Sequence, residues 1–198
     1  MGQELEYKYR LPDQAEYRKL CQALQACFPG GWERVTMETD YYDTSSHQLA
    51  QRRWTLRIRN ENGASVLCLK IPGAGLARQE WEVPEGVLPG GLVALVRQGA
   101  PESLLTLTGL RPVCGARFVR LRRMVPLSGA AVELALDRGV LLGSTKELPF
   151  WELEAELKSG DSQILDQWCQ TLATKFSLTP EPASKFARAY ALMGGNHA

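Results

Sequence analysis

The chain has 198 residues, and its 23 lysines and arginines nearly balance its 22 aspartates and glutamates, which leaves a formal net charge of +1. This balance provides no bulk electrostatic field to attract nucleic acid or an anionic membrane, so we expect neither as a partner. The length suits one sizeable hydrophobic core, and we expect a single domain over residues 1–198.

The first predicted element is a strand near the N-terminus with one charged face. Glu4, Glu6 and Lys8 alternate with Leu5 and Tyr7. Because successive side chains of a strand point to opposite faces, two acids and one base share one face and the apolar side chains share the other.

A helix and a series of strands are predicted next. The sequence predicts Asp13 as the N-cap of a helix, with Glu16 three residues later, and the helix ends at the Pro-Gly-Gly of 29–31. The alternating pattern then predicts strands over 33–43, 54–60, 65–71 and 78–84, with a hairpin turn at 60–63. Residues 85–110 are rich in Gly, Pro and Leu, which indicates loops around one or two short helices.

In the second half of the chain, the sequence predicts three strands followed by two helices. Strands are predicted over 118–125, 131–137 and 150–157, a helix after Asp161, and a last helix over 183–192. About eight mostly antiparallel strands with helices near both ends are typical of a closed barrel. We therefore expect an α+β fold, in which an eight-stranded antiparallel β-barrel encloses a charged tunnel and is flanked by helices, including a C-terminal one.

Membrane, secretory and cysteine-based classes are not favoured. The longest uncharged central stretch, 86–96, is far shorter than the roughly 20 apolar residues of a membrane span. Glu4 and Glu6 stand where a signal peptide carries basic residues. The five cysteines are odd in number and scattered, which argues against a disulfide framework or a structural zinc site. We expect a soluble, cytoplasmic protein with reduced cysteines.

The charge alternation of the first strand recurs in four later segments. In a single strand, such alternation is usually explained by one face turned to solvent. Repeated rows of carboxylates and guanidinium groups, with few neutral polar residues between them, favour a charged barrel interior instead. The later positions are Arg57, Arg59, Glu80, Glu82, Arg120, Arg122, Glu152, Glu154 and Glu156.

A charged interior suits a polyphosphate bound with a divalent metal. Buried charges cost several kcal/mol each unless they are paired, and a polyphosphate with Mg²⁺ would pair with both rows. Guanidinium and ammonium groups hold phosphate oxygens, and carboxylates hold hard cations. The sequence contains neither a Gly-x-x-x-x-Gly-Lys-Ser/Thr loop nor a Gly-x-Gly-x-x-Gly motif, so the common nucleotide-binding folds are not supported.

Six motifs carry a family resemblance. They are Glu4-x-Glu6-x-Lys8, Tyr41-Tyr42-Asp43-Thr44, Leu56-Arg57-Ile58-Arg59, Leu69-Lys70, the Glu80/Glu82 pair and Glu152-Leu153-Glu154. In this order they resemble the CYTH superfamily, or triphosphate tunnel metalloenzymes, which includes class IV adenylate cyclases, thiamine triphosphatases and bacterial inorganic triphosphatases. The resemblance extends over essentially the whole chain, and the stretches 133–139 and 184–190 look most similar to the bacterial inorganic triphosphatases.

The resemblance implies a role for each charged row. It implies a metal ion, Mg²⁺ or Mn²⁺, held by acids, and a triphosphate held by bases. Glu80 and Glu82 would orient the bases or contribute to a second metal site. The implied metal ligands are Glu4, Glu6, Asp137, Glu152 and Glu154. The implied substrate-binding residues are Lys8, Arg57, Arg59, Lys70, Arg120, Arg122 and Lys185.

The resemblance leaves two choices open between neighbouring residues, one for the tyrosine beside Lys8 and one for the arginine that faces the interior. Lys8 with Tyr41 would activate the attacking water, with Tyr42 as the alternative to Tyr41. Arg122 or Arg123 would face the interior, and its parity with Arg120 favours Arg122. In some bacterial relatives a histidine-rich helical domain follows this one, whereas this sequence ends at residue 198.

The expected function is hydrolysis of the terminal phosphate of inorganic triphosphate (tripolyphosphate) by a metal-dependent enzyme. The alternatives are a thiamine triphosphatase or another organic triphosphatase, and a non-catalytic module that binds polyphosphate or a nucleoside triphosphate. An adenylate cyclase is less favoured because no base-recognition feature is evident. Retention of all the metal-site acids favours the enzyme, since binding alone needs mainly the basic rows. The expected partner is a triphosphate-containing small molecule.

Overall fold

The computed structural model describes residues 2–73, 78–84 and 87–194. In these residues ten strands form one antiparallel sheet in the order β1-β6-β5-β4-β3-β7-β8-β9-β2-β10. The strands are β1 (Gly2–Glu4), β2 (Glu6–Arg10), β3 (Glu33–Asp43), β4 (Thr55–Glu61), β5 (Ala64–Pro72), β6 (Arg78–Val83), β7 (Arg111–Leu127), β8 (Ala130–Leu142), β9 (Glu147–Gly160) and β10 (Thr179–Pro180).

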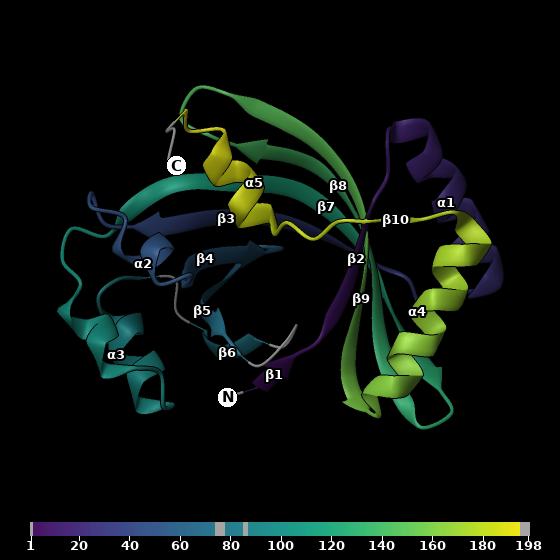
Figure 1. The fold of residues 1–198 in the computed structure, drawn as a ribbon, viewed down its shortest axis with the longest axis horizontal. Coiled ribbons are helices and arrows are strands. Elements are labelled where there is room, and N and C mark those ends of the chain that lie inside the picture. Colours follow the sequence, from purple (N-terminus) through teal and green to yellow (C-terminus); the bar gives the residue numbers. More distant parts are fainter. Residues whose placement is uncertain (1, 74–77, 85–86, 195–198) are drawn as a thin grey trace.

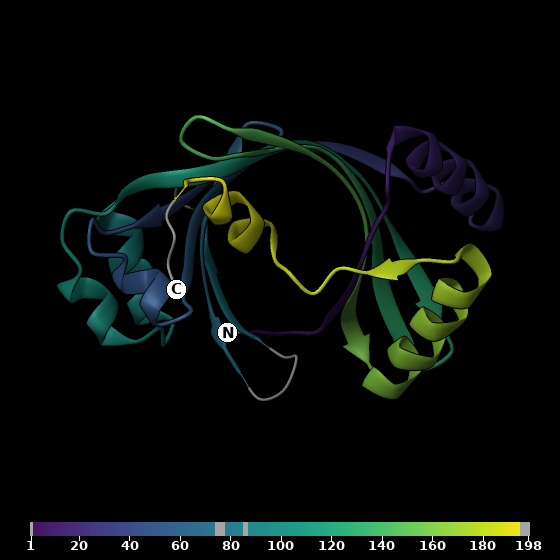
Figure 2. The same ribbon diagram turned by 45° about the horizontal axis from the view of Figure 1, so that its top comes forward.

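The sheet is strongly curved. Strands β3, β7 and β8 arch across the molecule (Figure 1). They connect the three strands β4, β5 and β6 on one side with β9 and β2 on the other. Figure 2 shows the strands arranged around a central region. Because side chains alternate along each strand, this curvature turns one set of side chains inward and the other outward.

The N-terminal segment reaches both ends of this arrangement. β1 pairs with β6, and Glu4 lies opposite Arg78. β2 pairs with β9, and Glu6 lies opposite Glu156. Between them the carbonyl of Leu5 accepts a hydrogen bond from the backbone N–H of Leu157 at 2.9 Å. Residues 2–10 therefore pair with both β6 and β9, which are not paired with each other in the described residues.

The antiparallel sheet and its flanking helices agree with the prediction, but the closed eight-stranded barrel is not confirmed. The predicted first strand is divided at Leu5, because its two halves pair with different partners. The short β10, which pairs with Arg10 and Tyr9, was not predicted, because a two-residue strand next to a proline has no alternating pattern. In the described residues these differences account for ten strands in place of eight.

The helices lie mainly outside the curved sheet, and α5 is the exception. Asp13 accepts hydrogen bonds from the backbone N–H groups of Ala15 and Glu16, and Asp161 accepts one from Gln163, so both predicted N-caps are confirmed. The helices are α1 (Gln14–Cys27), α2 (Gln48–Gln51), α3 (Gly90–Arg97), the 3₁₀-helix η1 (Glu102–Thr106), α4 (Ser162–Phe176) and α5 (Lys185–Ala191).

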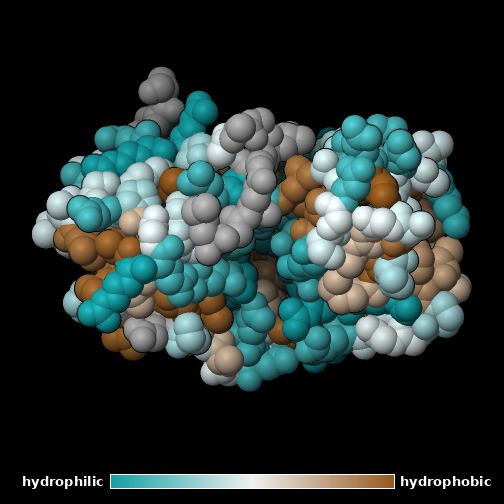
Figure 3. Space-filling view, turned by 90° about the horizontal axis from the view of Figure 1, so that it is seen from below, coloured by the Kyte–Doolittle hydropathy of each residue, from teal (hydrophilic) through white to brown (hydrophobic). Residues whose placement is uncertain are grey.

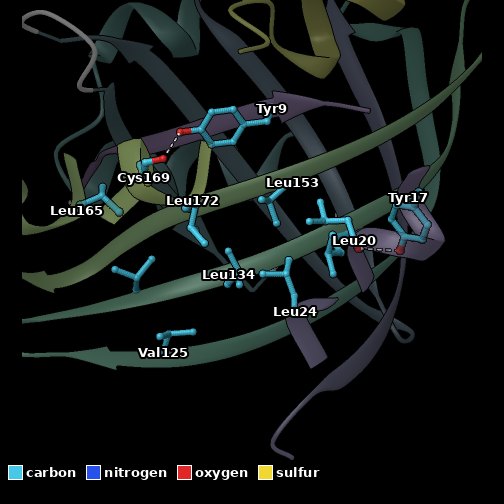
Figure 4. Packing of buried hydrophobic residues seen from close by; sticks show 13 residues of the cluster. Tyr9, Tyr17, Leu20, Leu24, Val125, Leu134, Leu153, Leu165, Cys169 and Leu172 are labelled. Carbon is cyan, nitrogen blue, oxygen red and sulfur yellow. Dashed lines mark hydrogen bonds between the residues drawn. The ribbon is translucent and has the colours of Figure 1, made fainter. Parts of the chain in front are cut away.

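Outward-facing apolar side chains form the main core beneath α1 and α4 (Figure 4). Leu134 and Leu153 from the sheet pack against Leu24 of α1 and Leu165 of α4, and all four are fully buried. The hydroxyl of Tyr9 donates to the carbonyl of Cys169 at 3.2 Å. A second apolar cluster lies on the outward face beneath α3, and a third lies on the inner side beneath α5. Burial of the outward face leaves the charged face of the sheet turned inward.

All five cysteines are free thiols in the structure, and three of them are buried. No helix in residues 2–73, 78–84 and 87–194 is long and apolar enough to cross a membrane.

Candidate functional site

A charged cavity lies on the inner face of the sheet. Every strand from β1 to β9 contributes to its wall, as does the start of α5. From below, Figure 3 shows a hollow in the middle of the molecule that is bordered mainly by hydrophilic residues. The predicted site residues that line the cavity are Glu4, Glu6, Lys8, Tyr41, Arg57, Arg59, Lys70, Glu80, Glu82, Arg120, Arg122, Glu154 and Lys185.

The other two predicted metal ligands, Asp137 and Glu152, lie next to this wall. Together with Glu154 they form a cluster that we call the acidic trio. Asp137 on β8 pairs directly with Glu152 on β9, and Glu154 is two residues further along the same strand. One carboxylate oxygen of each lies within 4.8 Å of the others. Asp137 and Glu152 are fully buried and Glu154 nearly so. Three oxygens at this spacing are a suitable ligand set for a hard cation.

Basic side chains from two other elements contact the acidic trio. Arg120 on β7 donates two hydrogen bonds of 2.8 Å to Asp137, one to each oxygen, and a third to Glu154. Lys185 at the start of α5 contacts all three acids. Burial alone would raise the pKa of Glu154, but Lys185 and Arg120 lower it well below its usual range. Glu154 is therefore ionised.

The opposite wall, formed by β4, β5 and β6, carries the bases Arg57, Arg59, Lys70 and Arg78 together with Glu61, Glu80 and Glu82, and we call it the basic wall. Lys70 contacts Glu4 and lies 3.3 Å from Glu80, which is also 3.6 Å from Arg57. Burial alone would raise the pKa of Glu80, but Lys70 and Arg57 lower it to about 2. The Nε of Arg57 is buried and has no hydrogen-bond partner within the described residues. This donor is available for an anion in the cavity.

Lys8 and Glu6 project from β2 into the cavity. Burial lowers the pKa of Lys8, although Glu154 and Glu6 partly offset this effect. Burial together with the neighbouring Glu154 and Glu4 raises the pKa of Glu6. A lysine with a lowered pKa is more often neutral than an exposed one. The neutral amine is the form that can accept a proton as a general base.

Comparison with known proteins identifies the family. The family model described as the CYTH domain matches residues 2–190. The chain belongs to the CYTH domain family. The inorganic triphosphatase of Haemophilus influenzae is 32% identical to this CYTH domain over 164 residues, which cover 81% of the chain and 47% of the relative. The chain therefore spans about half the length of the curated relative that it matches.

Solved structures have the same fold as this CYTH domain at low sequence identity. The Hippeastrum protein HpAC1, a candidate adenylyl cyclase with a dominant triphosphatase activity, matches with a TM-score of 0.64 and 20% identity, covering 98% of both chains. The triphosphatase of the Mimivirus capping enzyme matches with a TM-score of 0.56 and 10% identity, covering 88% of this chain and 89% of its own. These likenesses support the fold alone.

The structure distinguishes between the two tyrosines left open above. Tyr41 is buried at the cavity wall of the CYTH domain, where its ring lies 5.2 Å from that of Phe186 on α5. Burial raises the pKa of Tyr41, while the charges of Arg57 and Lys185 lower it. Tyr42 instead packs against the apolar cluster beneath α3. Strand parity explains the difference, since neighbours on β3 face opposite ways.

The two arginines left open on β7 also lie on opposite faces. Arg122 lines the cavity near its mouth, and its Nε donates to Glu33 at 3.0 Å. Arg123 faces outward, where its Nη1 donates to the carbonyls of Phe28 at 2.8 Å and Pro29 at 2.9 Å. Arg123 therefore stabilises the C-terminal end of α1, where helix carbonyls lack intrahelical partners.

Sequence reasoning assigned no role to Arg188, although the structure brings it to the acidic trio. Arg188 donates to Glu152 and stacks over the ring of Phe150 at 5.6 Å. A signal for it was present, because Arg188 follows Lys185 by three residues and residues at this spacing share one face of a helix. The cavity wall also includes Glu61, Glu133 and Glu156, of which only Glu156 belongs to the alternating rows recognised in the sequence.

Proposed function

We propose that this CYTH domain is a metal-dependent triphosphatase that hydrolyses the terminal phosphate of inorganic triphosphate. One observation carries the proposal: a single cavity has buried acids on one wall and bases with free donor capacity on the other, in a chain 32% identical to an inorganic triphosphatase. We further propose that the strands close around the substrate as a tunnel, with the N-terminal segment joining the two ends of the sheet.

The acidic trio fits Mg²⁺ or Mn²⁺. All three ligands are carboxylates, which these hard cations prefer, and the buried Oε2 of Glu152 has the ion-pair contact of Lys185 but no directed hydrogen bond from the described residues. Asp137, Glu152 and Glu154 would hold one ion, and Glu4 and Glu6 would complete its surroundings from the N-terminal strand. When bound, the ion would neutralise charge on the triphosphate and on the transferring phosphoryl group.

The bases of the cavity bind and orient the triphosphate. Arg57, Arg59 and Lys70 hold phosphate oxygens from the basic wall, and Arg120, Arg122 and Lys185 hold them from the other side. Guanidinium groups suit this role because they donate two parallel hydrogen bonds to one phosphate. The unpartnered Nε of Arg57 supports this assignment. Glu80 and Glu82 keep the basic side chains in position through their ion pairs.

Lys8 and Tyr41 prepare the attacking water. The water oxygen forms a bond to the terminal phosphorus, the bridging P–O bond breaks, diphosphate leaves, and the water proton passes to Nζ of Lys8. The lowered pKa of Lys8 and the position of Tyr41 on the same cavity support this assignment.

The composition of the cavity wall favours an inorganic substrate. Most of its side chains are charged, and the aromatic ones are Tyr41, Phe118 and Phe186. Trp54 and Trp81 pack outward in the cluster beneath α3. Recognition of a base or a thiamine ring usually relies on a largely apolar pocket with a few polar groups, which this wall does not resemble.

Phosphate release from tripolyphosphate, thiamine triphosphate and ATP tests the proposal. Each substrate is measured with Mg²⁺, with Mn²⁺ and with chelator, for the wild type and for Glu4→Gln. The matched control is Glu38→Gln, because Glu38 is exposed on the outer face of β3. We expect metal-dependent turnover of tripolyphosphate that Glu4→Gln abolishes and Glu38→Gln leaves unchanged.

Three results would contradict the proposal. Metal-dependent binding without turnover of any substrate would indicate a non-catalytic binding module. A strong preference for thiamine triphosphate would assign an organic triphosphatase. Unfolding of Glu4→Gln, detected by circular dichroism, would show that this acid is structural.

A further inference from the structure

Lys185 occupies the position at the acidic trio where a cation would bind. Its Nζ lies 2.9 Å from Oδ2 of Asp137 and 2.6 Å from both Oε2 of Glu152 and Oε1 of Glu154. The side chain is nine-tenths buried, and the rings of Phe118 and Phe150 lie 5.2 and 5.3 Å from Nζ. α5 lies on the inner side of the sheet beside β7 and β8 (Figures 1 and 2).

The ammonium and a divalent ion exclude each other at this position. Mg²⁺ binds carboxylate oxygens at about 2.0–2.1 Å and demands near-octahedral geometry. An ion bound by the trio would therefore occupy the space of Nζ, and two cations at that separation would also repel each other strongly in a buried site. One of them must leave before the other can bind.

The ammonium of Lys185 does not satisfy all the carboxylate oxygens of the acidic trio. An ammonium has three N–H donors, and Lys185 makes a well-directed hydrogen bond to Glu154. Its contact with Glu152 is close, but Oε2 of Glu152 receives no hydrogen bond from the described residues. The ammonium thus balances the charge of the trio without satisfying all of its oxygens.

The remainder of α5 has anchors that do not depend on Lys185. The hydroxyl of Tyr190 and Nδ1 of His47 lie 2.5 Å apart in a hydrogen bond. Phe186 packs its ring against those of Tyr41 and Tyr190. Arg188 contacts both Glu152 and Glu181. The side chain of Lys185 can therefore leave the trio while the helix stays in place.

We propose that Lys185 is a tethered competitor of the divalent metal: it occupies the acidic trio in the metal-free protein and is displaced when the ion binds. The inference rests on the proposed function, because it takes the trio as the metal site. The displaced ammonium is then free to contact a phosphate of the substrate, so metal loading prepares the cavity for the anion.

Direct Mn²⁺ binding without substrate tests the competition. Mn²⁺ affinity is measured by electron paramagnetic resonance for the wild type, Lys185→Met and Lys185→Arg. Lys158→Met is the matched control, because Lys158 also lines the cavity but pairs with Glu156 instead of the trio. We expect Lys185→Met to tighten Mn²⁺ binding by about tenfold or more, since its competing charge is lost. Lys185→Arg should stay near the wild type, and Lys158→Met should change the affinity by less than about threefold.

Lysine reactivity in the wild type provides a second measurement that does not depend on the folding of a variant. Acetylation of Lys185 by acetic anhydride, followed by mass spectrometry, should rise severalfold when Mg²⁺ is added, because the ammonium leaves its buried ion pairs. Lys19 is the control, because it is exposed on α1 and its acetylation should not respond.

The outcomes separate this inference from the proposed function. Equal or weaker Mn²⁺ binding by Lys185→Met, with metal-dependent turnover in the wild type, would overturn the competition and leave the triphosphatase proposal intact. Unchanged acetylation of Lys185 on metal loading would also overturn it. Absence of Mn²⁺ binding by both the wild type and Lys185→Met would overturn the competition together with the proposed metal site.

Discussion

The two walls of the cavity differ in how their charges are compensated. The acidic trio is buried on β8 and β9, and the bases that contact it come from β7 and from α5, which lies near the end of the chain. On the basic wall, the side chains of Arg57 and Lys70 are 17% and 12% exposed; both lie near Glu80 on β6, and Lys70 also contacts Glu4 on β1. The acidic wall therefore depends partly on a helix near the C-terminal end of the described chain, whereas the charges of the basic wall are compensated within the sheet.

This difference indicates how each wall responds to the loss of a charge. Removing one member of a buried and densely paired cluster leaves its partners uncompensated, which is costly. Removing a charge from a partly exposed wall is less costly, because water screens the remaining groups. The predictions below test this comparison, from the largest expected effect to the smallest.

Substitution of a trio acid should have the largest effect. We expect Glu152→Gln to lower the turnover of tripolyphosphate by at least about a hundredfold, because Glu152 is a proposed metal ligand. Phosphate release at saturating Mg²⁺ measures the effect. Glu147→Gln is the matched control, because Glu147 is exposed on the same strand. Turnover by Glu152→Gln within a factor of three of the wild type would show that the acidic wall does not hold the metal.

Loss of a guanidinium group from the basic wall should weaken substrate binding more than it lowers the maximal rate. We expect Arg57→Met to raise the KM for tripolyphosphate by about ten- to a hundredfold, since a hydrogen bond to a charged group contributes about 1.5–3 kcal/mol. Steady-state kinetics separates KM from kcat. Arg117→Met serves as the control, because Arg117 is exposed on the outer face of β7. An unchanged KM would remove Arg57 from the substrate site.

The pH dependence of stability should reveal the ion pairs of Glu80. Its pKa of about 2 in the folded protein is lower than its ordinary value of 4.5, so its contribution to stability is complete above pH 4.5 and is lost as the pH falls towards 2. We expect Glu80→Gln to be less stable than the wild type by about 1–3 kcal/mol at pH 7. The difference should shrink below pH 4.5 in urea unfolding with chelator present. A difference that grows on acidification would contradict these ion pairs.

The anchor of α5 should have the smallest effect. Tyr190→Phe removes the hydrogen bond to His47 and should lower the free energy of unfolding by about 0.5–1.5 kcal/mol. Turnover should fall by less than about threefold, because Arg188 and Phe186 still hold the helix. Thermal unfolding and phosphate release measure the two effects, with Tyr42→Phe beneath α3 as the control. A loss of turnover as large as that of Glu152→Gln would show that α5 is positioned mainly by this bond.

Strand parity was the property that the sequence predicted best. The alternation of Glu4, Glu6 and Lys8 placed all three on one face, and in the structure all three line the cavity. The same argument separated Arg122 from Arg123. These predictions succeed because the side-chain period of a strand is local and does not depend on which strands pair.

Contacts that depend on pairing or on helix docking could not be predicted in the same way. Nothing local to Leu5 shows that the residues before and after it pair with different strands. The direct contact of Lys185 with the acidic trio arises from the docking of α5 on β7 and β8, which are distant in sequence. Arg188 reaches Glu152 through the same docking. Alternation shows which face a residue occupies, but not which partner it meets across the cavity.

The pairing of the N-terminal segment has a consequence for folding. β2 pairs with β9, from which it is separated by most of the described chain. The proposed metal acid Glu6 therefore cannot reach its native neighbours until β9 has been synthesised. Pairing between such distant segments raises the contact order and slows folding. We infer that assembly of the β1–β6 and β2–β9 ladders completes the fold, after the hairpins from β3 to β8 have formed.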